Sequence, residues 1–286
     1  MIMAKNIVWN QSLITAKPSF EKFAELQETI LFAKEQEIEL FINIESRLGL
    51  SFLFCLSTLP ALAQSNGKEI RIFCNSKSKM LFDRNGYISK ENVEANTNIA
   101  PQLYQNSRII SDVDSIYNLV TEITKEAPIE MSDDLAALFT SKVGEMYNNS
   151  IEHSGAQYVI GGKYYKNQKN KYCFACYDTG IGIPNKVKQY LDSDISDLAA
   201  FKWAMKRGHS TANRSGYMQV PRGLGLGLLQ NFAKTNNGAI RICSGSVLYT
   251  YTPQKGDSYY GLQHEFKGTL FEMDIIADNH HRYILK

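Results

Sequence analysis

The chain has 286 residues, 44% of them hydrophobic and 21% charged, with a formal net charge of +2 at pH 7. It is long enough for two domains, and so small a net charge gives no sign of nucleic acid or an anionic membrane as a partner. The sequence shows no low-complexity tract, no signal peptide and no apolar run long enough to cross a bilayer. Its five cysteines form no secreted disulfide framework, so we predict a reduced, cytoplasmic protein.

The first hundred residues predict alternating strands and helices. Apolar spacing indicates strands at 6–9, 39–44 and 69–74, and helices at 19–36 and 50–64. Alternation of this kind favours a small α/β unit.

A boundary region follows this unit. The stretch 89–98 is polar, and Ala127-Pro128 ends a helix that the pattern predicts over 111–125. We therefore predict an N-terminal α/β domain over 1–110, which binds a protein partner or senses a signal, and a second domain over 111–286.

A long helix is predicted from Ser132, a suitable N-cap, to about Ser154, with Gly155 as its stop. Glu145 and Asn149 lie four residues apart on it, so they share one face at the edge of its apolar stripe. Polar groups in such a place need partners, which an ordinary hydrogen-bonding role would also supply.

Two strands, at 158–165 and 171–177, are predicted next, and Asp178 follows the second directly. A carboxylate here can accept a hydrogen bond from the exocyclic amino group of adenine, a donor that guanine lacks at that position. Gly180 and Gly182 let the backbone turn sharply and approach a flat base. The alternative is a simple turn, because Asp, Gly and Pro are all turn formers.

A second glycine run, Gly223, Gly225 and Gly227, precedes a helix expected over 228–235. Glycines that open a helix present backbone N–H groups and the positive dipole end to phosphate. The run has neither the preceding strand and trailing acid of a dinucleotide site nor the Gly-Lys-Ser/Thr ending of a P-loop. No acidic residue occurs from Leu198 to Gly256, where eight lysines and arginines fall. This excess suits a bound polyanion, although a solvated basic face is the alternative.

These motifs, in this order, resemble those of the GHKL ATPase superfamily, which groups DNA gyrase, the large heat-shock chaperones, histidine kinases and mismatch-repair ATPases. The segment 145–153 resembles its N-box, 178–184 its first glycine box and 223–229 its second. The segment 267–271 resembles the late Gly-Thr strand that closes the adenine site. The likeness covers about half of the chain, from residue 135 to residue 276.

The resemblance implies a Bergerat-type fold, a two-layer α/β sandwich with helices on one face of a mixed sheet, that binds ATP and Mg²⁺. Carried over by position, it implies that Glu145 is the catalytic base for water and that Asn149 holds Mg²⁺. The nucleotide-binding residues that it implies are Asp178, Gly180, Gly182 and Thr269 for adenine, and Arg222, Gly223, Gly225 and Gly227 for phosphate. The segment 185–222 would be a mobile lid.

The branch of the superfamily stays open. No histidine precedes His153, so the chain is not expected to be a self-contained sensor histidine kinase. We expect an ATPase whose lid couples hydrolysis to a protein partner. The alternatives are a serine/threonine protein kinase of the anti-sigma-factor type and a non-catalytic, ATP-dependent binding switch. Residues 39–87 loosely resemble a STAS domain, and members of the superfamily often form homodimers.

Cys173 and Cys176 have the spacing of a zinc or redox pair. Side chains three residues apart on a strand point to opposite faces, however, so we predict that both cysteines pack in the core.

Overall fold

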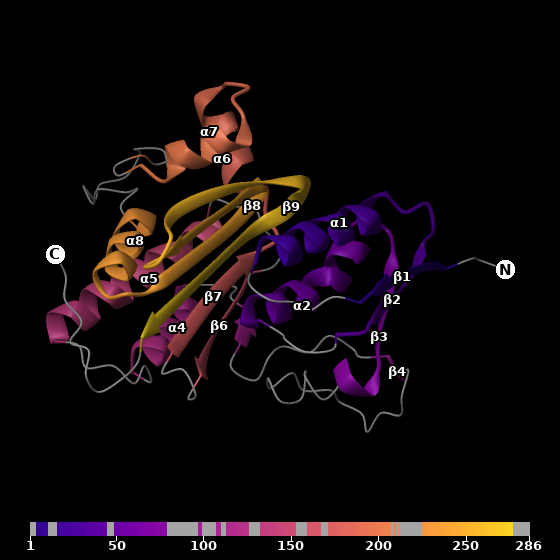
Figure 1. Cartoon of the computed structure of the whole chain (residues 1–286), viewed down its shortest axis with the longest axis horizontal. Helices are drawn as coiled ribbons and strands as arrows, with labels where there is room; N and C mark the ends of the chain where they lie inside the picture. Colours follow the sequence, from indigo (N-terminus) through magenta and orange to yellow (C-terminus); the bar gives the residue numbers. More distant parts are fainter. Residues whose placement is uncertain are drawn as a thin grey trace.

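The computed structural model describes residues 4–10, 16–44, 49–78, 97–98, 107–109, 113–125, 132–152, 159–166, 171–206, 209, 211 and 225–276. Two β-sheets and the helices between and beside them make a mixed α/β protein (Figure 1). Within these residues no helix is long and apolar enough to cross a membrane.

The N-terminal sheet has three parallel strands, β1 (Lys5–Trp9), β2 (Glu37–Ile42) and β3 (Glu69–Cys74), and a short antiparallel edge strand, β4 (Thr97–Asn98). Parallel neighbours need crossover connections, and α1 (Lys17–Phe32) and α2 (Leu50–Gln64) supply them. The predicted alternation of strands and helices is therefore confirmed.

The C-terminal sheet has five strands in the order β5-β6-β7-β9-β8. Their bounds are β5 (Ser107–Ile109), β6 (Val159–Lys166), β7 (Lys171–Asp178), β8 (Ala239–Thr252) and β9 (Gly256–Ile276). Every pairing among these described strands is antiparallel, so the expectation of a mixed sheet was wrong. The physical reason is the connectivity, because β6 and β7, like β8 and β9, follow each other as hairpin neighbours.

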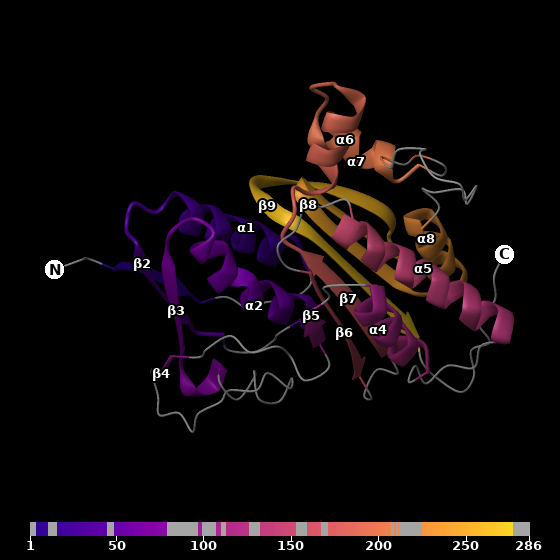
Figure 2. The same ribbon diagram turned by 180° about the vertical axis from the view of Figure 1, so that it is seen from behind.

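Three helices cover one face of this sheet: α4 (Val113–Lys125), α5 (Asp133–Glu152) and α8 (Gly225–Thr235) (Figure 2). Ser132 caps α5 as predicted, its hydroxyl accepting the N–H of Leu135 at 3.3 Å. Aromatic rings from α5, α8 and β7 meet in this core, with Phe139 lying 5.0 Å from Phe232 and 5.7 Å from Phe174 between ring centroids.

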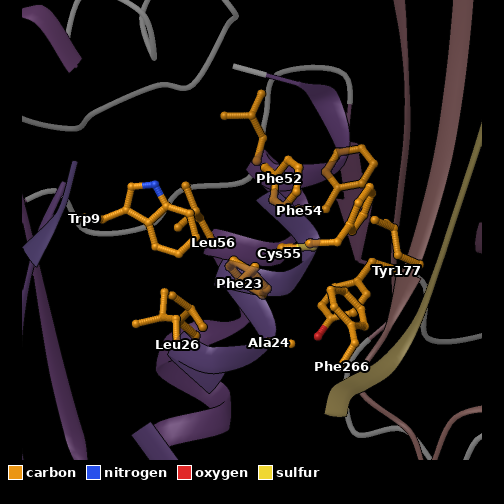
Figure 3. Close-up of a cluster of buried hydrophobic side chains, with 14 of the residues drawn as sticks. Trp9, Phe23, Ala24, Leu26, Phe52, Phe54, Cys55, Leu56, Tyr177 and Phe266 are labelled. Carbon is orange, nitrogen blue, oxygen red and sulfur yellow. The ribbon is translucent and has the colours of Figure 1, made fainter. Parts of the chain in front are cut away.

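The opposite face of the same sheet is covered by α1 and α2, which lie between the two sheets (Figure 1). The helices and the sheet share one continuous core, in which Phe23 lies beside Phe266 and Phe52 (Figure 3). The prediction of helices on one face only was wrong, because α1 and α2 cover the second face. The available signal was the continuous apolar run 172–177 in β7, which is typical of a strand packed on both sides, and the structure buries it throughout.

Candidate functional site

Asp178 ends β7 and is 2% exposed. Its neighbour in the sheet is Thr269 on β9, so the structure brings these two predicted site residues together. The carboxylate accepts the N–H of Gly180 at 3.0 Å, and the Ser150 hydroxyl and the Thr269 backbone also hydrogen bond to it. Burial raises the pKa of Asp178 to about 7, against the lowering effect of these bonds.

Two glycines allow the chain to close around Asp178. Gly268 has φ +89°, and a Cβ at this position would lie 1.9 Å from the carbonyl oxygen of Asp178. Gly182 has φ +82°, and a Cβ there would lie 2.8 Å from Ser244 Oγ. Only glycine fits either position, so the predicted glycine turn lies directly against the Gly268-Thr269 step.

Ser244 on β8 joins these segments and was not among the predicted site residues. Its fully buried hydroxyl accepts the N–H of Ile183 at 2.8 Å and donates to the carbonyl of Gly268 at 2.9 Å. It also lies 3.1 Å from Thr269 Oγ1. Ser244 directly follows the apolar residues Ile242 and Cys243, but no motif marked it.

Helix α5 runs beside β7 and carries Glu145 and Asn149, the residues predicted to act as base and metal ligand. Tyr147 donates to the carbonyl of Ala175 at 3.0 Å, which places the last turns of α5 next to Asp178. Asn149 lies in these turns directly before Ser150, although its side chain is outside the described residues. Glu145 forms an ion pair with Lys142 at 3.1 Å on the same helix.

The second glycine run is described only in part. Helix α8 begins at Gly225, and Gly227 lies in its first turn with open space around its Cα. Arg222 and Gly223 lie outside the described residues. The far end of α8 is fixed by Asp257 near the β8–β9 turn, whose carboxylate binds Lys234 at 2.6 Å and Gln230 at 2.9 Å.

The segment expected to form a lid begins with two helices, α6 (Ile183–Leu191) and α7 (Asp197–Ala204), that extend beyond the end of the sheet (Figure 2). Asp197 anchors α7 to β8 by accepting both the N–H and the hydroxyl of Ser246 at 2.9 Å. It also forms an ion pair with Lys188 at 2.7 Å. Most of the remaining lid, from 207 to 222, lies outside the described residues.

A second polar cluster lies on the opposite face of the sheet. Ligand atoms of Cys173, Glu272 and Asp274 lie within 4.8 Å of one another. Arg241 fills this cluster, with Nη1 at 2.7 Å from Glu272 and 3.1 Å from Asp274, and so supplies the cation that the carboxylates need. The buried Cys176 belongs to the other core, so the prediction that the two cysteines point apart is confirmed.

A scan against protein-family models and a search of curated proteins each found no match for this chain. The geometry around Asp178 and the order of the motifs therefore carry the functional argument.

Proposed function

We propose that residues 111–286 bind ATP with Mg²⁺ between the end of α5, the glycine turn after β7 and the first turn of α8. The observation that supports this most strongly is Asp178, a carboxyl group buried at a strand end whose pKa is raised to about 7. Acids whose pKa is shifted by burial cluster at functional sites. Its carboxylate would accept the exocyclic amino group of adenine, with Thr269 beside it.

The arrangement of elements supports the same proposal. The helix with Asn149, the strand with Asp178, the α8 glycines and the strand with Thr269 belong to one sheet and the helices on one of its faces. In a Bergerat-type site Asn149 would hold Mg²⁺ through its amide oxygen. Gly180 and Gly182 would let the base approach, and Arg222, Gly223, Gly225 and Gly227 would bind the phosphates.

The state of Glu145 favours a second candidate, an ATP-dependent binding switch without hydrolysis. The Glu145 carboxylate is held 3.1 Å from the ammonium of Lys142 through Oε2, an ion pair that a purely structural role for this residue also explains. Hydrolysis would have to use the other oxygen of this carboxylate. The third candidate is transfer of phosphate to a serine or threonine of a protein partner, and its product is a phosphoprotein.

Calorimetric titration tests nucleotide binding. We expect wild type to bind Mg·ATP more tightly than Mg·GTP, and Asp178→Ala to bind Mg·ATP about 10- to 100-fold more weakly, because a charged hydrogen bond in a buried site is lost. The matched control is Asp114→Asn, an exposed carboxylate in the first turn of α4, which should bind like wild type. Equal affinity of wild type and Asp178→Ala would overturn the proposal.

Product analysis then separates the catalytic possibilities. If Glu145 activates water, Glu145→Gln abolishes phosphate release while Mg·ATP affinity is retained. If wild type binds Mg·ATP but neither releases phosphate nor transfers it to a protein, the binding switch is established. Phosphate release that is unchanged in Glu145→Gln would remove this residue from the catalytic role.

A further inference from the structure

Residues 263–267 of β9 form what we call the entry segment, because they lead directly into Gly268 and Thr269. Strand β7 pairs with β9 only from Thr269 onward, so the entry segment continues past the end of its neighbour. On its other side, the pairing with β8 shifts register between Gly245 and Val247. Within this segment only Phe266 has a partner in β8, which is Gly245, so the other backbone groups depend on partners from outside the sheet.

Helix α1 of the N-terminal unit supplies these partners. The Glu21 carboxylate accepts the N–H groups of Gln263 and, at 3.2 Å, of His264. The Glu28 carboxylate accepts the N–H of Glu265 at 3.2 Å and lies 2.9 Å from His264 Nδ1. Side chains of α1 thus occupy the place that a neighbouring strand would take.

Gln27 makes the contact nearest the candidate site. Its side chain is fully buried and pairs with both backbone groups of Lys267, accepting the N–H at 3.0 Å and donating to the carbonyl at 3.3 Å. Its amide also donates to the Tyr177 hydroxyl at 2.9 Å, and that hydroxyl donates to the Lys267 carbonyl at 2.8 Å. Tyr177 directly precedes Asp178, and Lys267 directly precedes Gly268.

We propose that Gln27 is a positioning residue for the candidate nucleotide site, through which the N-terminal unit sets the affinity for ATP. This inference rests on the proposed function. One side-chain amide holds the two strands that carry Asp178 and Thr269, at Tyr177, one residue before Asp178, and at Lys267, two residues before Thr269. The Tyr177 and Phe266 rings beside it lie in the apolar cluster with Phe23 (Figure 3), so water cannot replace these hydrogen bonds. Small displacements of a supporting residue are enough to weaken a site.

The entry segment also reaches the lid. Glu265 accepts the side-chain amide of Asn185, at the start of α6, at 3.2 Å. Through this segment, α1 is connected both to the residues proposed to bind the base and to the first helix of the lid. A change in the N-terminal unit therefore alters nucleotide affinity, and nucleotide binding alters the N-terminal unit to the same extent.

The test is calorimetric titration of Mg·ATP and Mg·GTP into the full chain. Gln27→Met keeps the side-chain volume and removes both hydrogen-bonding groups. We expect it to weaken Mg·ATP binding about tenfold and to lower the preference for ATP over GTP. The matched control is Thr29→Val on the same helix, which removes one hydroxyl bonded only to the Glu25 carbonyl. It should bind both nucleotides like wild type.

A double-mutant cycle distinguishes positioning from general stability. If Gln27 acts by placing Asp178, Gln27→Met should have little effect on ATP affinity in an Asp178→Asn background. Equal effects in both backgrounds, or an unchanged ATP-to-GTP ratio, would overturn the positioning role. If Gln27→Met does not fold by circular dichroism, Tyr177→Phe removes the shared hydroxyl, keeps the ring and should weaken binding about threefold.

The wild-type titration separates the two proposals. No binding by wild type would overturn the proposed function and this inference with it. Binding that is weakened by Asp178→Asn but equally tight in wild type, Gln27→Met and Tyr177→Phe would overturn the inference alone.

Discussion

Asp178 is an ionisable residue that is almost completely buried. A carboxyl group that is 2% exposed and bonded only to hydrogen-bond donors loses hydration without gaining a cation, which raises its pKa from 3.8 to about 7. The folded protein therefore binds this proton more tightly than the unfolded chain. Its contribution to the free energy of unfolding is present in full below about pH 4 and is lost as pH rises through about 7.

The first prediction concerns the pH dependence of binding. The ionised carboxylate is the stronger acceptor for adenine, so Mg·ATP affinity should fall as pH is lowered from 8 to 6. Asp178→Asn cannot titrate and should lack this part of the pH dependence. Protonation of ATP itself affects both proteins equally, so the ratio of the two affinities, measured by calorimetry, isolates Asp178. A ratio that is constant with pH would contradict the assignment.

The second prediction concerns Gly268. A methyl group there would overlap the Asp178 carbonyl at 1.9 Å, and φ is +89°. Gly268→Ala should lower the free energy of unfolding by more than about 3 kcal/mol, measured by urea denaturation, because steric overlap adds to the backbone strain. Gly256→Ala is the control. Its φ is +66° with nothing within 4 Å of a Cβ, so it should lose only about 1–2 kcal/mol.

At the scale of elements, the interface between α2 and the C-terminal sheet contains a charge cluster. Ser51 of α2 donates to the Glu272 carboxylate on β9, and Arg241 of β8 pairs with the same group. The side chains of Arg241 and Glu272 are 14% and 3% exposed. Burial raises the pKa of Glu272, and Arg241 opposes that effect. Removing one member of a buried ion pair leaves the other charge uncompensated, which destabilises the fold.

The third prediction follows from this cluster. Arg241→Met should lower the free energy of unfolding at pH 7.5 by about 3–5 kcal/mol, because it leaves a buried carboxylate uncompensated. The loss should shrink at low pH, where Glu272 is protonated. Arg71→Met is the control, since Arg71 also pairs with two carboxylates at 3.0 Å but its side chain is 40% exposed. Its loss should be at most about 1 kcal/mol. Equal losses for the two variants in urea denaturation would contradict this reasoning.

Most elements could be predicted because their cues are local. Helix α2 and strand β3 occur at the predicted bounds, and α5 begins after Ser132 as expected. Helices α6 and α7 were not predicted within the lid segment, because polar residues and short length weaken the helical pattern there. The length of β9, from Gly256 to Ile276, was also missed, since its first half is mostly partly exposed and has no sustained apolar alternation.

At the scale of the whole molecule, the notable feature is the shared core between α1, α2 and the C-terminal sheet. This core includes Phe20, whose ring centroid lies 5.1 Å from that of Phe52 and 6.3 Å from that of Phe266. Separation of the two halves would expose this apolar surface to water, at a cost of roughly 25 cal/mol for each Å². The two halves should therefore unfold together.

The fourth prediction tests this cooperativity. The chain has two tryptophans, and Trp9 is buried in the N-terminal unit at 3% exposure. In Trp203→Phe, fluorescence reports Trp9 alone, while far-UV circular dichroism reports the helices of both halves. We expect the same urea midpoint from both signals. A lower midpoint for Trp9 would show that the N-terminal unit unfolds separately.

Local patterns in the chain were enough to predict the alternation of strands and helices in the first hundred residues and the bounds of α2 and β3, because periodicity and caps act over a few residues. The placing of Thr269 beside Asp178 was implied only by the family resemblance, and the sheet register brings the two together. The covering of both sheet faces, the Ser244 hydroxyl and the Gln27 amide emerged only from the tertiary structure. Gln27 and Lys267 are 240 residues apart in sequence. A buried polar residue in an amphipathic helix has no local signature of its partner, since that partner is determined by how the layers pack.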